Sequence, residues 1–186
     1  MEKRVIKADP KKWFAIYRTL LYQHALPRVN NSDIAEDLVQ ETFLSALKGL
    51  NGFKAEASEK NWLFAILKNK IIDFYRKKAK EPSVMSMPDL QLTENDWFDE
   101  EGSWAENKMP KDWQASDNPT ERKEIQKIIN SCKDHLKVLQ QHVFTLKYME
   151  DLKSEEICKV LNISSFNYWV LIHRARLQMR DCVEKY

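Results

Sequence analysis

Aromatic, amide and cationic side chains alternate along residues 61–78, which read NWLFAILKNKIIDFYRKK. On a helix with 100° per residue, one arc of this segment is apolar, which predicts a buried face. That arc holds Leu63, Leu67, Ile71 and Phe74, and the opposite arc holds Trp62, Ala65, Asn69, Asp73 and Arg76. The second arc can stack on an unpaired base, bond its edge and hold phosphates. A solvated basic helix with Trp62 in the core is the simpler alternative.

Two further helices are predicted ahead of this segment. Residues 11–29 carry apolar side chains at three- and four-residue spacing, and Pro27 predicts the end of that helix. In the next helix, Ser32 is the predicted N-cap and Gly49 the predicted stop. A polar loop over residues 51–60 then leads into the basic helix, which we expect to end near Lys80.

The C-terminal third predicts a helix-turn-helix. A helix over about 120–132 is followed by a second helical pattern that ends near Asp151. Ser154 is the predicted cap of a short helix, and Asn162 is suited to the left-handed conformation that closes it. Ser164 is then expected to cap the last helix, which reaches to about Glu184.

Composition bounds the fold class. The chain has 186 residues, of which 43% are apolar and only 3 are Gly, so it favours helices over tight β-hairpins. We therefore expect an all-α protein of two small helical domains joined by an irregular linker. The expected boundaries are 1–80 for the first domain, 81–119 for the linker and 120–186 for the second domain.

Charge is distributed in blocks along the chain. Residues 1–80 carry 16 Lys or Arg and 9 Asp or Glu, residues 81–121 carry 2 and 11, and residues 122–186 carry 12 and 8. This order predicts two units that face polyanions, separated by a segment that phosphate repels. The acidic linker also contains Trp97, Trp104 and Trp113, whose role the sequence does not define.

Three cysteines are widely spaced and form no CxxC pair, which argues against both a disulfide framework and a zinc site. We therefore expect a reducing, cytoplasmic compartment. No run approaches the roughly 20 apolar residues of a membrane span. Catalytic motifs such as HExxH, GxSxG or a Gly-rich phosphate loop are absent from the sequence, so we expect no enzyme, no cofactor and no metal.

The basic helix resembles region 2 of the extracytoplasmic-function sigma factors of bacterial RNA polymerase, within the sigma-70 superfamily. Their motif W-L-x-x-I-A-x-N-x-x-x-D-x-x-R is met here, with Leu67 where Ala is usual; the matching positions are Trp62, Leu63, Ile66, Asn69, Asp73 and Arg76. EEICKVLNIS followed by HRAR resembles region 4 of the same family. Together the two units cover roughly three quarters of the chain.

This resemblance implies a transcription initiation factor that binds core RNA polymerase through the β′ clamp and the β flap. It implies a clamp-binding patch at Asp37, Gln40, Glu41, Phe43 and Leu44. It also implies recognition and melting of the minus-ten element by one loop and one helix. The residues implied for that site are Asn51, Lys54, Lys60, Asn61, Trp62, Lys68, Asn69, Asp73, Arg76 and Lys77. The linker is implied to thread through the polymerase active-site cleft.

The last helix departs most from the family pattern. Tyr168, Ile172, Ala175 and Met179 form one apolar arc, while Phe166, Trp169, Val170 and Leu177 form a second on the opposite side. A helix that reads the major groove offers polar side chains to base edges, and this helix has few of them. We therefore expect its surface to contact a protein, such as an anti-sigma factor or a targeting protein, with minus-35 DNA as the alternative. The candidate residues are Ser164, Ser165, Phe166, Asn167, Trp169, His173, Arg174 and Arg176.

Two other functions fit parts of the sequence. A helix-turn-helix repressor would bind duplex DNA without polymerase. A helical adaptor would bind protein only and would have no affinity for single-stranded minus-ten DNA. A transcription assay reconstituted with core polymerase would separate all three functions.

Overall fold

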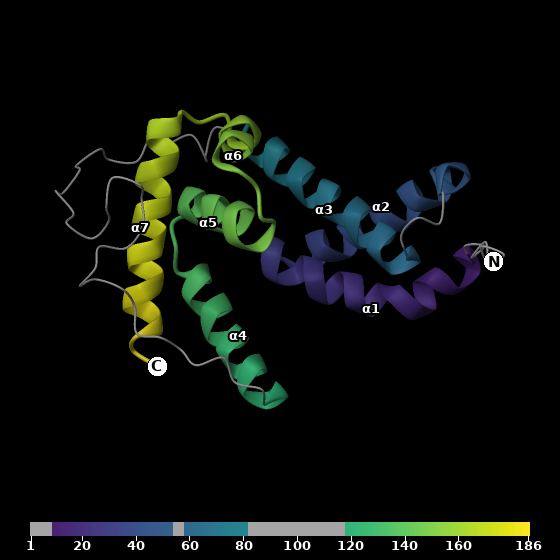
Figure 1. The fold of residues 1–186 in the computed structure, drawn as a ribbon, viewed down its shortest axis with the longest axis horizontal. Helices are drawn as coiled ribbons and strands as arrows, with labels where there is room; N and C mark the ends of the chain where they lie inside the picture. The colour runs from purple at the N-terminus through teal and green to yellow at the C-terminus, as the bar shows by residue number, and fades with distance from the viewer. Residues whose placement is uncertain (1–8, 54–57, 82–117) are drawn as a thin grey trace, which may run out of the picture. The chain divides into compact units, whose positions relative to one another are not determined.

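The computed structural model describes residues 9–53, 58–81 and 118–186, in which all regular elements are helical (Figure 1). The chain divides into two compact units, residues 1–78 and residues 79–186. Most of the predicted linker, with Trp97, Trp104 and Trp113, lies outside the described residues.

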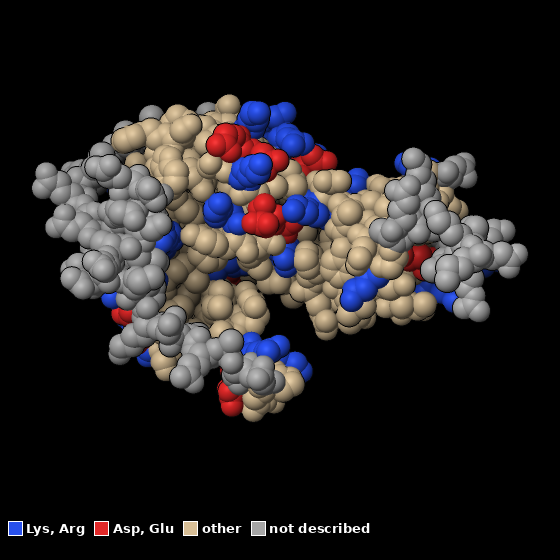
Figure 2. Space-filling model, viewed as in Figure 1, with Lys and Arg blue, Asp and Glu red and all other residues tan. Residues whose placement is uncertain are grey.

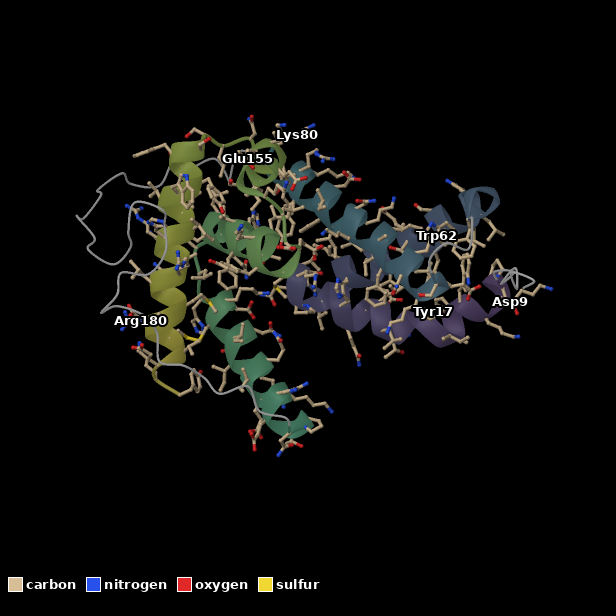
Figure 3. The ribbon with its side chains drawn as sticks, in the orientation of Figure 1. Asp9, Tyr17, Trp62, Lys80, Glu155 and Arg180 are labelled. Carbon is tan, nitrogen blue, oxygen red and sulfur yellow. A yellow bond between two sulfur atoms is a disulfide. The ribbon has the colours of Figure 1, made fainter. Side chains whose placement is uncertain are left out.

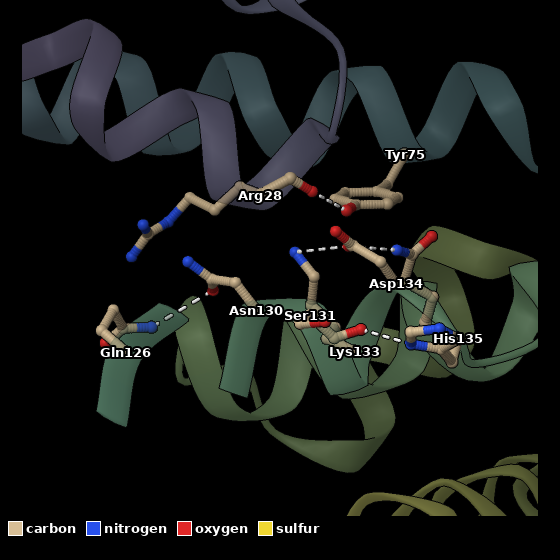
Figure 4. Close-up of polar contacts among 9 residues, drawn as sticks. Arg28, Tyr75, Gln126, Asn130, Ser131, Lys133, Asp134 and His135 are labelled. Atoms are coloured by element: carbon tan, nitrogen blue, oxygen red, sulfur yellow. Dashed lines mark hydrogen bonds and ion pairs between the residues drawn. The ribbon is translucent and has the colours of Figure 1, made fainter. Parts of the chain in front are cut away.

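The described residues of the first unit form three α-helices that pack on one another. They are α1 (Pro10–Val29), α2 (Ser32–Lys48) and α3 (Glu59–Lys78), with a short 3-10 turn η1 (Leu50–Gly52) after α2. The core contains Trp13, Leu21, Ala25, Ala35, Leu38, Val39, Leu63, Leu67, Ile71 and Tyr75. The Tyr75 hydroxyl also donates to the Arg28 carbonyl, which fastens the end of α3 to the end of α1 (Figure 4).

Helix α1 ends at Val29 as predicted, but Pro27 does not mark that end, and the predicted N-cap of α2 is wrong by one residue. Pro27 lies inside α1, and the helix instead closes at Asn30, whose left-handed backbone lets its N–H bond the Leu26 carbonyl. Ser32 is the first residue of α2, and its cap is Asn31, whose side chain accepts from the N–H groups of Asp33 and Ile34. Both residues are Asn, which tolerates positive φ and caps well.

The buried arc of α3 matches the prediction at three positions and differs at the fourth. Leu63, Leu67 and Ile71 are fully buried, but Tyr75 takes the fourth core position and Phe74 is only half-buried. A spacing of four residues continues the buried row from Ile71 to Tyr75, and the Tyr75 hydroxyl finds a backbone acceptor there. The predicted core position at Phe74 is therefore corrected by one residue.

Within residues 118–186, the described part of the second unit contains four α-helices and one π-helical turn. In order they are α4 (Pro119–Asp134), α5 (Val138–Phe144), η3 (Thr145–Met149), α6 (Ser154–Leu161) and α7 (Ser165–Val183). Helix α7 packs against α4, α5 and α6 and is therefore the central element of this unit. The helix-turn-helix is formed by α6 and α7 (Figure 1).

The turn between α6 and α7 follows the sequence closely. Asn162 has φ 54° and closes α6, and the Ser164 side chain accepts from the Asn167 N–H at 3.2 Å, as predicted. Ser154 is not the cap of α6, because it is already helical. Lys153 precedes it, and its backbone N–H donates to the Glu156 carboxylate at 2.9 Å.

The expectation that no disulfide forms is wrong. Cys132 near the end of α4 is bonded to Cys182 near the end of α7, with a Cα–Cα distance of 5.7 Å. Their separation of 50 residues gave no local signal, because the packing of α4 on α7 is what brings them together. Cys158 is a free thiol.

Candidate nucleic-acid interface

Helix α3 exposes a row of polar side chains on the side away from its buried arc. Asn61, Asn69 and Arg76 are exposed, and Asp73 belongs to the same row with half of its side chain accessible. The interior of the unit therefore does not sequester these groups. An amide, a carboxylate and a guanidinium are available to a ligand along about four turns of one helix.

Arg76 and Asp73 form an ion pair one turn apart on α3. Their side chains are 51% and 50% exposed, so the pair faces solvent. Exposed pairs of this kind contribute little to stability. The pair instead fixes the position of the Arg76 guanidinium, because the Asp73 carboxylate holds it near the surface of α3.

Trp62 is half-buried at the beginning of α3, where Figure 3 labels it. Its ring lies edge-on to Trp13 at 5.7 Å and tilted against Phe53 at 4.9 Å between centroids. A Cβ added at Gly49 would lie 3.7 Å from the Trp62 ring, so α2 also ends close to it. Trp62 is therefore anchored in an aromatic cluster with Trp13 and Phe53, and the sequence analysis missed its two partners.

The predicted cations around this row have different environments. Lys60 is exposed with its Nζ 5.9 Å from the Phe64 ring centroid, Lys77 is exposed and Lys68 is half-buried. Lys54 and the side chain of Asn51 lie outside the described residues. Acidic and basic side chains are interspersed on the face drawn in Figure 2, with no patch of one sign.

The predicted polymerase patch on α2 is accessible at four of its five positions. Asp37, Gln40, Glu41 and Leu44 are exposed, and Leu44 is 57% exposed. The prediction of Phe43 as a surface anchor needs correction, because its side chain is only 9% exposed and packs on Phe14 at 5.7 Å. Leu44 and Leu47 are instead the exposed large apolar side chains of α2.

Helix α1 adds exposed apolar side chains that the sequence analysis did not assign to a surface. Phe14, Ile16 and Leu20 are exposed, whereas the core positions of α1 are Trp13, Leu21 and Ala25. The Arg18 guanidinium lies 5.5 Å from the Phe14 ring centroid and pairs with Glu36 of α2 at 2.9 Å. Helical spacing did not separate these two faces, because both are largely apolar.

Helix α7 keeps one of its two predicted apolar arcs in the core and exposes half of the other, while Leu177 is half-buried. Tyr168, Ile172, Ala175 and Met179 are buried as predicted, and so is Val170. Phe166 and Trp169 are 54% and 45% exposed, and Ser164 and Ser165 beside them are also exposed. Asn167, His173, Arg174 and Arg176 are half-buried. Burial, with a smaller contribution from Arg176, lowers the pKa of His173.

Family models match both units. A model described as sigma-70 region 2 matches residues 13–81, and one described as sigma-70, region 4 matches residues 126–179. A probable RNA polymerase sigma factor of Haemophilus influenzae is 39% identical over 90% of this chain and 86% of its own length. The chain belongs to the extracytoplasmic-function sigma factors. The ECF RNA polymerase sigma factor SigM of Bacillus subtilis is 26% identical over 90% of each chain.

The family assigns this sigma factor its partners: core RNA polymerase and promoter DNA. This sigma factor is a transcription regulator. Its family membership rules out both alternatives, the polymerase-independent repressor and the protein-binding adaptor. A solved sigma factor, RpoE with the anti-sigma factor NepR from Bartonella quintana, is 21% identical over 94% of this chain and 96% of that one, with a TM-score of 0.42. That likeness is too weak to support an argument.

Metal and membrane sites are absent from the described part of the sigma factor. Within residues 9–53, 58–81 and 118–186, no three His, Cys, Asp or Glu side chains gather where they could hold a metal ion. Among the helices described there, none is both long and apolar enough to cross a bilayer.

Proposed function

We propose that α3 of this sigma factor captures the unpaired strand of the minus-ten element. The observation that carries the proposal is the exposed row of Asn69, Asp73 and Arg76, which lies opposite the buried row of Leu67 and Ile71. A rigid helix packed on α1 and α2 presents these groups to the nucleic acid. The row can bond base edges while neighbouring cations hold the backbone.

The energetics of strand separation favour such a surface. Removing a base from the duplex costs a few kcal/mol, so a site that captures the open state must return a similar amount. Stacking on an aromatic side chain contributes about 1–3 kcal/mol per base, and phosphate contacts add a salt-dependent term. We assign phosphate contacts to Lys60 and Lys77, and we propose that the accessible part of Trp62 supports stacking while its other faces remain packed.

A transcription assay with core polymerase tests strand capture. Asn69→Ala and Arg76→Ala should each reduce opening of a duplex promoter about tenfold, because each loses a contact made only to the open strand. On a template with a pre-melted minus-ten bubble, the same variants should reduce transcription less than on the duplex template, since binding no longer depends on separating the strands. Gln23→Ala, an exposed change on α1, is the matched control and should have no effect.

The result that contradicts strand capture is equally specific. If Asn69→Ala and Arg76→Ala open the duplex template as well as the unchanged protein does, the exposed row has no role in melting. If they weaken both templates and also weaken binding to core polymerase, the row belongs to a protein interface instead.

We propose that α1 and α2 together form the surface that docks on the polymerase β′ clamp. Leu44 is its apolar centre, and Asp37 and Glu41 form a charged rim. Phe14 of α1 packs on Phe43, the residue before Leu44. Apolar anchors within a polar rim are the usual anatomy of a protein interface. Leu44→Ala should therefore weaken the complex with core polymerase about tenfold or more, and Lys48→Ala, an exposed change at the end of α2, is the control.

A second assignment concerns α7. The exposed Phe166 and Trp169 favour a protein partner for region 4, because their side chains offer few hydrogen bonds to base edges. Trp169→Ala should then weaken binding to that partner and leave binding to a duplex minus-35 fragment unchanged. The opposite outcome, loss of duplex binding with every protein partnership intact, would assign the surface to DNA.

The place of action follows from the partners. A factor that acts on bacterial RNA polymerase works in the cytoplasm, and we propose that location for this chain. Its contribution to initiation is binding and positioning, so we assign no catalytic step to any of its side chains.

A further inference from the structure

The bond between Cys132 and Cys182 lies where α4 is attached to the rest of the second unit. Cys132 is 1% exposed and belongs to a buried cluster with Leu136, Ala175 and Met179. Cys182 packs against this cluster and is half-buried, so it is less protected from solvent than Cys132. The two ends of the bond therefore differ in burial.

Helix α4 is held through its second half. Its first half, residues 119–127, is almost entirely exposed, and among the described helices of the unit α4 packs mainly against α7. Ile128, Ile129 and Cys132 provide apolar contacts of its second half, where Lys133 is also buried. The disulfide therefore joins α7 to the half of α4 that packs in the unit.

The expected compartment makes the bond informative. Disulfides are rare in the cytoplasm, where thiol reductants act on them, and those that occur there are usually transient. A factor that binds RNA polymerase works in that compartment. A bond in that compartment with one half-buried cysteine, on a helix whose first half is exposed, has the features of a reversible modification rather than a permanent link.

We propose that Cys132 and Cys182 form a reversible thiol–disulfide site that controls how firmly α4 is held on α7. Reduction begins when the thiolate of a dithiol reductant attacks the sulfur of Cys182, the less buried of the two cysteines, and the S–S bond breaks. Cys132 leaves as a thiolate and takes up a proton. The second thiol of the reductant then attacks the mixed disulfide, which releases Cys182 as a thiol and the reductant as its cyclic disulfide.

Oxidation reverses these steps with a small disulfide such as oxidised glutathione. The Cys182 thiolate attacks it and releases one molecule of reduced glutathione, and Cys132 then displaces the second to close the bond. Two protein thiols lose two hydrogens, and one oxidised glutathione becomes two reduced ones. The atoms balance without a metal or another cofactor.

Cys158 provides an internal reference. It is a free thiol on α6, and burial is the main cause that raises its pKa, with Glu155 acting in the same direction and a hydrogen bond with Ser165 opposing it. Because the thiolate is the reactive form, Cys158 reacts slowly with disulfides at neutral pH. Oxidation should therefore select the pair and leave this thiol free.

The experiment uses the full chain in glutathione buffers that range from strongly reducing, as in the cytoplasm, to fully oxidised. Free thiols are alkylated under native conditions, bonded ones are alkylated with a second reagent after denaturation and reduction, and mass spectrometry assigns each cysteine. We expect Cys132 and Cys182 to change together, free at the reducing end and bonded at the oxidised end. Cys158→Ser is the matched control and should show the same transition.

Amide hydrogen exchange and thermal unfolding supply the second readout. Reduction should increase exchange in α4 while α2 and α3 stay unchanged, and should lower the melting temperature of the second unit by about 10–20 °C. Cys182→Ser should show the reduced behaviour in every buffer. Since Cys182 is half-buried, this variant is expected to fold, whereas serine at Cys132 would lie in the core.

Four results would overturn the proposal. The first is a bond that stays closed in the native protein at the reducing end, which would make it a permanent link. The second is a pair of thiols that stay free at the oxidised end, and the third is a Cys182 that bonds to glutathione instead of to Cys132. The fourth is a pair that changes state with no difference in α4 exchange or in the melting temperature. None of these outcomes bears on strand capture by α3, so the two proposals can fail separately.

Discussion

Helices α3 and α7 each bury one side in their own unit, but they differ in what they place on the other side. Helix α3 exposes Asn69 and Arg76 opposite Leu67, so its two faces differ sharply in polarity. Helix α7 exposes Phe166 and Trp169 while it buries Tyr168. The first helix offers groups that suit a nucleic-acid strand, and the second offers rings that suit an apolar surface.

This difference shows what a hydrophobic period can and cannot assign. Where polar residues occupy one side, as in α3, the period identifies the buried side and the functional side together. Where both sides are apolar, as in α7, only packing decides which ring is core. Tyr168 and Trp169 are adjacent in sequence and their rings are 5.4 Å apart, yet one is buried and the other is not.

The largest expected effect compares these two neighbours. Tyr168→Ala should lower the unfolding free energy of the second unit by about 3–5 kcal/mol, because it removes a large buried ring from the core. Trp169→Ala should cost less than about 1 kcal/mol, because nearly half of that side chain is already in solvent. Urea unfolding followed by circular dichroism measures both changes.

Gln178→Ala, an exposed change on α7, is the control for helix propensity and should have almost no effect. Equal losses for Tyr168→Ala and Trp169→Ala would show that both rings are core. The second side of α7 would then have no apolar surface left for a partner.

The same comparison in the first unit gives a somewhat smaller effect. Leu67→Ala should lower its unfolding free energy by about 3 kcal/mol, while Asn69→Ala on the opposite side of α3 should change it by less than about 0.5 kcal/mol. Hydrogen exchange, resolved by unit, measures whether the loss stays in residues 1–78. If Leu67→Ala loosened both units equally, they would not be independent folding units.

Much of the fold could be predicted from the sequence because helix signals are local. The periods of α2 and α3, the stop at Gly49, the turn at Asn162 and the cap at Ser164 all depend on residues within one or two turns. Errors at Ser32 and Ser154 are of one kind. In each case the residue just before the predicted cap takes that place. Asn31 and Ser32 are equally good N-caps, whereas N-cap preference favours Ser154 over Lys153 and therefore misleads.

The candidate-site residues were also predicted well where the signal is local and poorly where it is not. Accessibility of Asn69, Asp73 and Arg76 followed from the pattern of a single helix. The burial of Phe43 depends on Phe14 of another helix, and the anchoring of Trp62 depends on Trp13 and Phe53. Contacts between distant segments have no local signal, and the cysteine pair is the clearest case.

A pH effect is expected in the first unit through His24. Burial, assisted by Arg28, lowers the pKa of this imidazole from 6.5 to about 4, and its ring packs edge-on against Phe64. Between pH 6.5 and 4 the unfolded chain therefore binds a proton that the folded unit does not. Stability is full above pH 6.5 and should fall by about 1–2 kcal/mol toward pH 4, a value reduced for partial exposure.

His24→Phe retains a ring against Phe64 and removes the titrating group. In urea unfolding at several pH values, this variant should show a flatter dependence of stability between pH 6.5 and 5 than the unchanged protein. An identical slope in the two proteins would mean that His24 is protonated as readily in the fold as in the unfolded chain. Its contact with Phe64 would then not exclude water from the imidazole.

The smallest expected effect compares one helix cap in each unit. The Asn31 side chain accepts from two backbone N–H groups, of Asp33 and Ile34, at 3.0 and 2.9 Å, whereas Ser164 accepts from one, of Asn167, at 3.2 Å. Asn31→Ala should cost about 1 kcal/mol in the first unit and Ser164→Ala somewhat less in the second. Asn31→Asp and Ser164→Thr keep the acceptors and should retain most of the stability in the same unfolding measurement. A larger loss of stability for Ser164→Ala than for Asn31→Ala would contradict this order. The single bond at the start of α7 would then stabilise its unit more than the two bonds at the start of α2 stabilise theirs. The turn before α7 would in that case depend on this serine for more than capping.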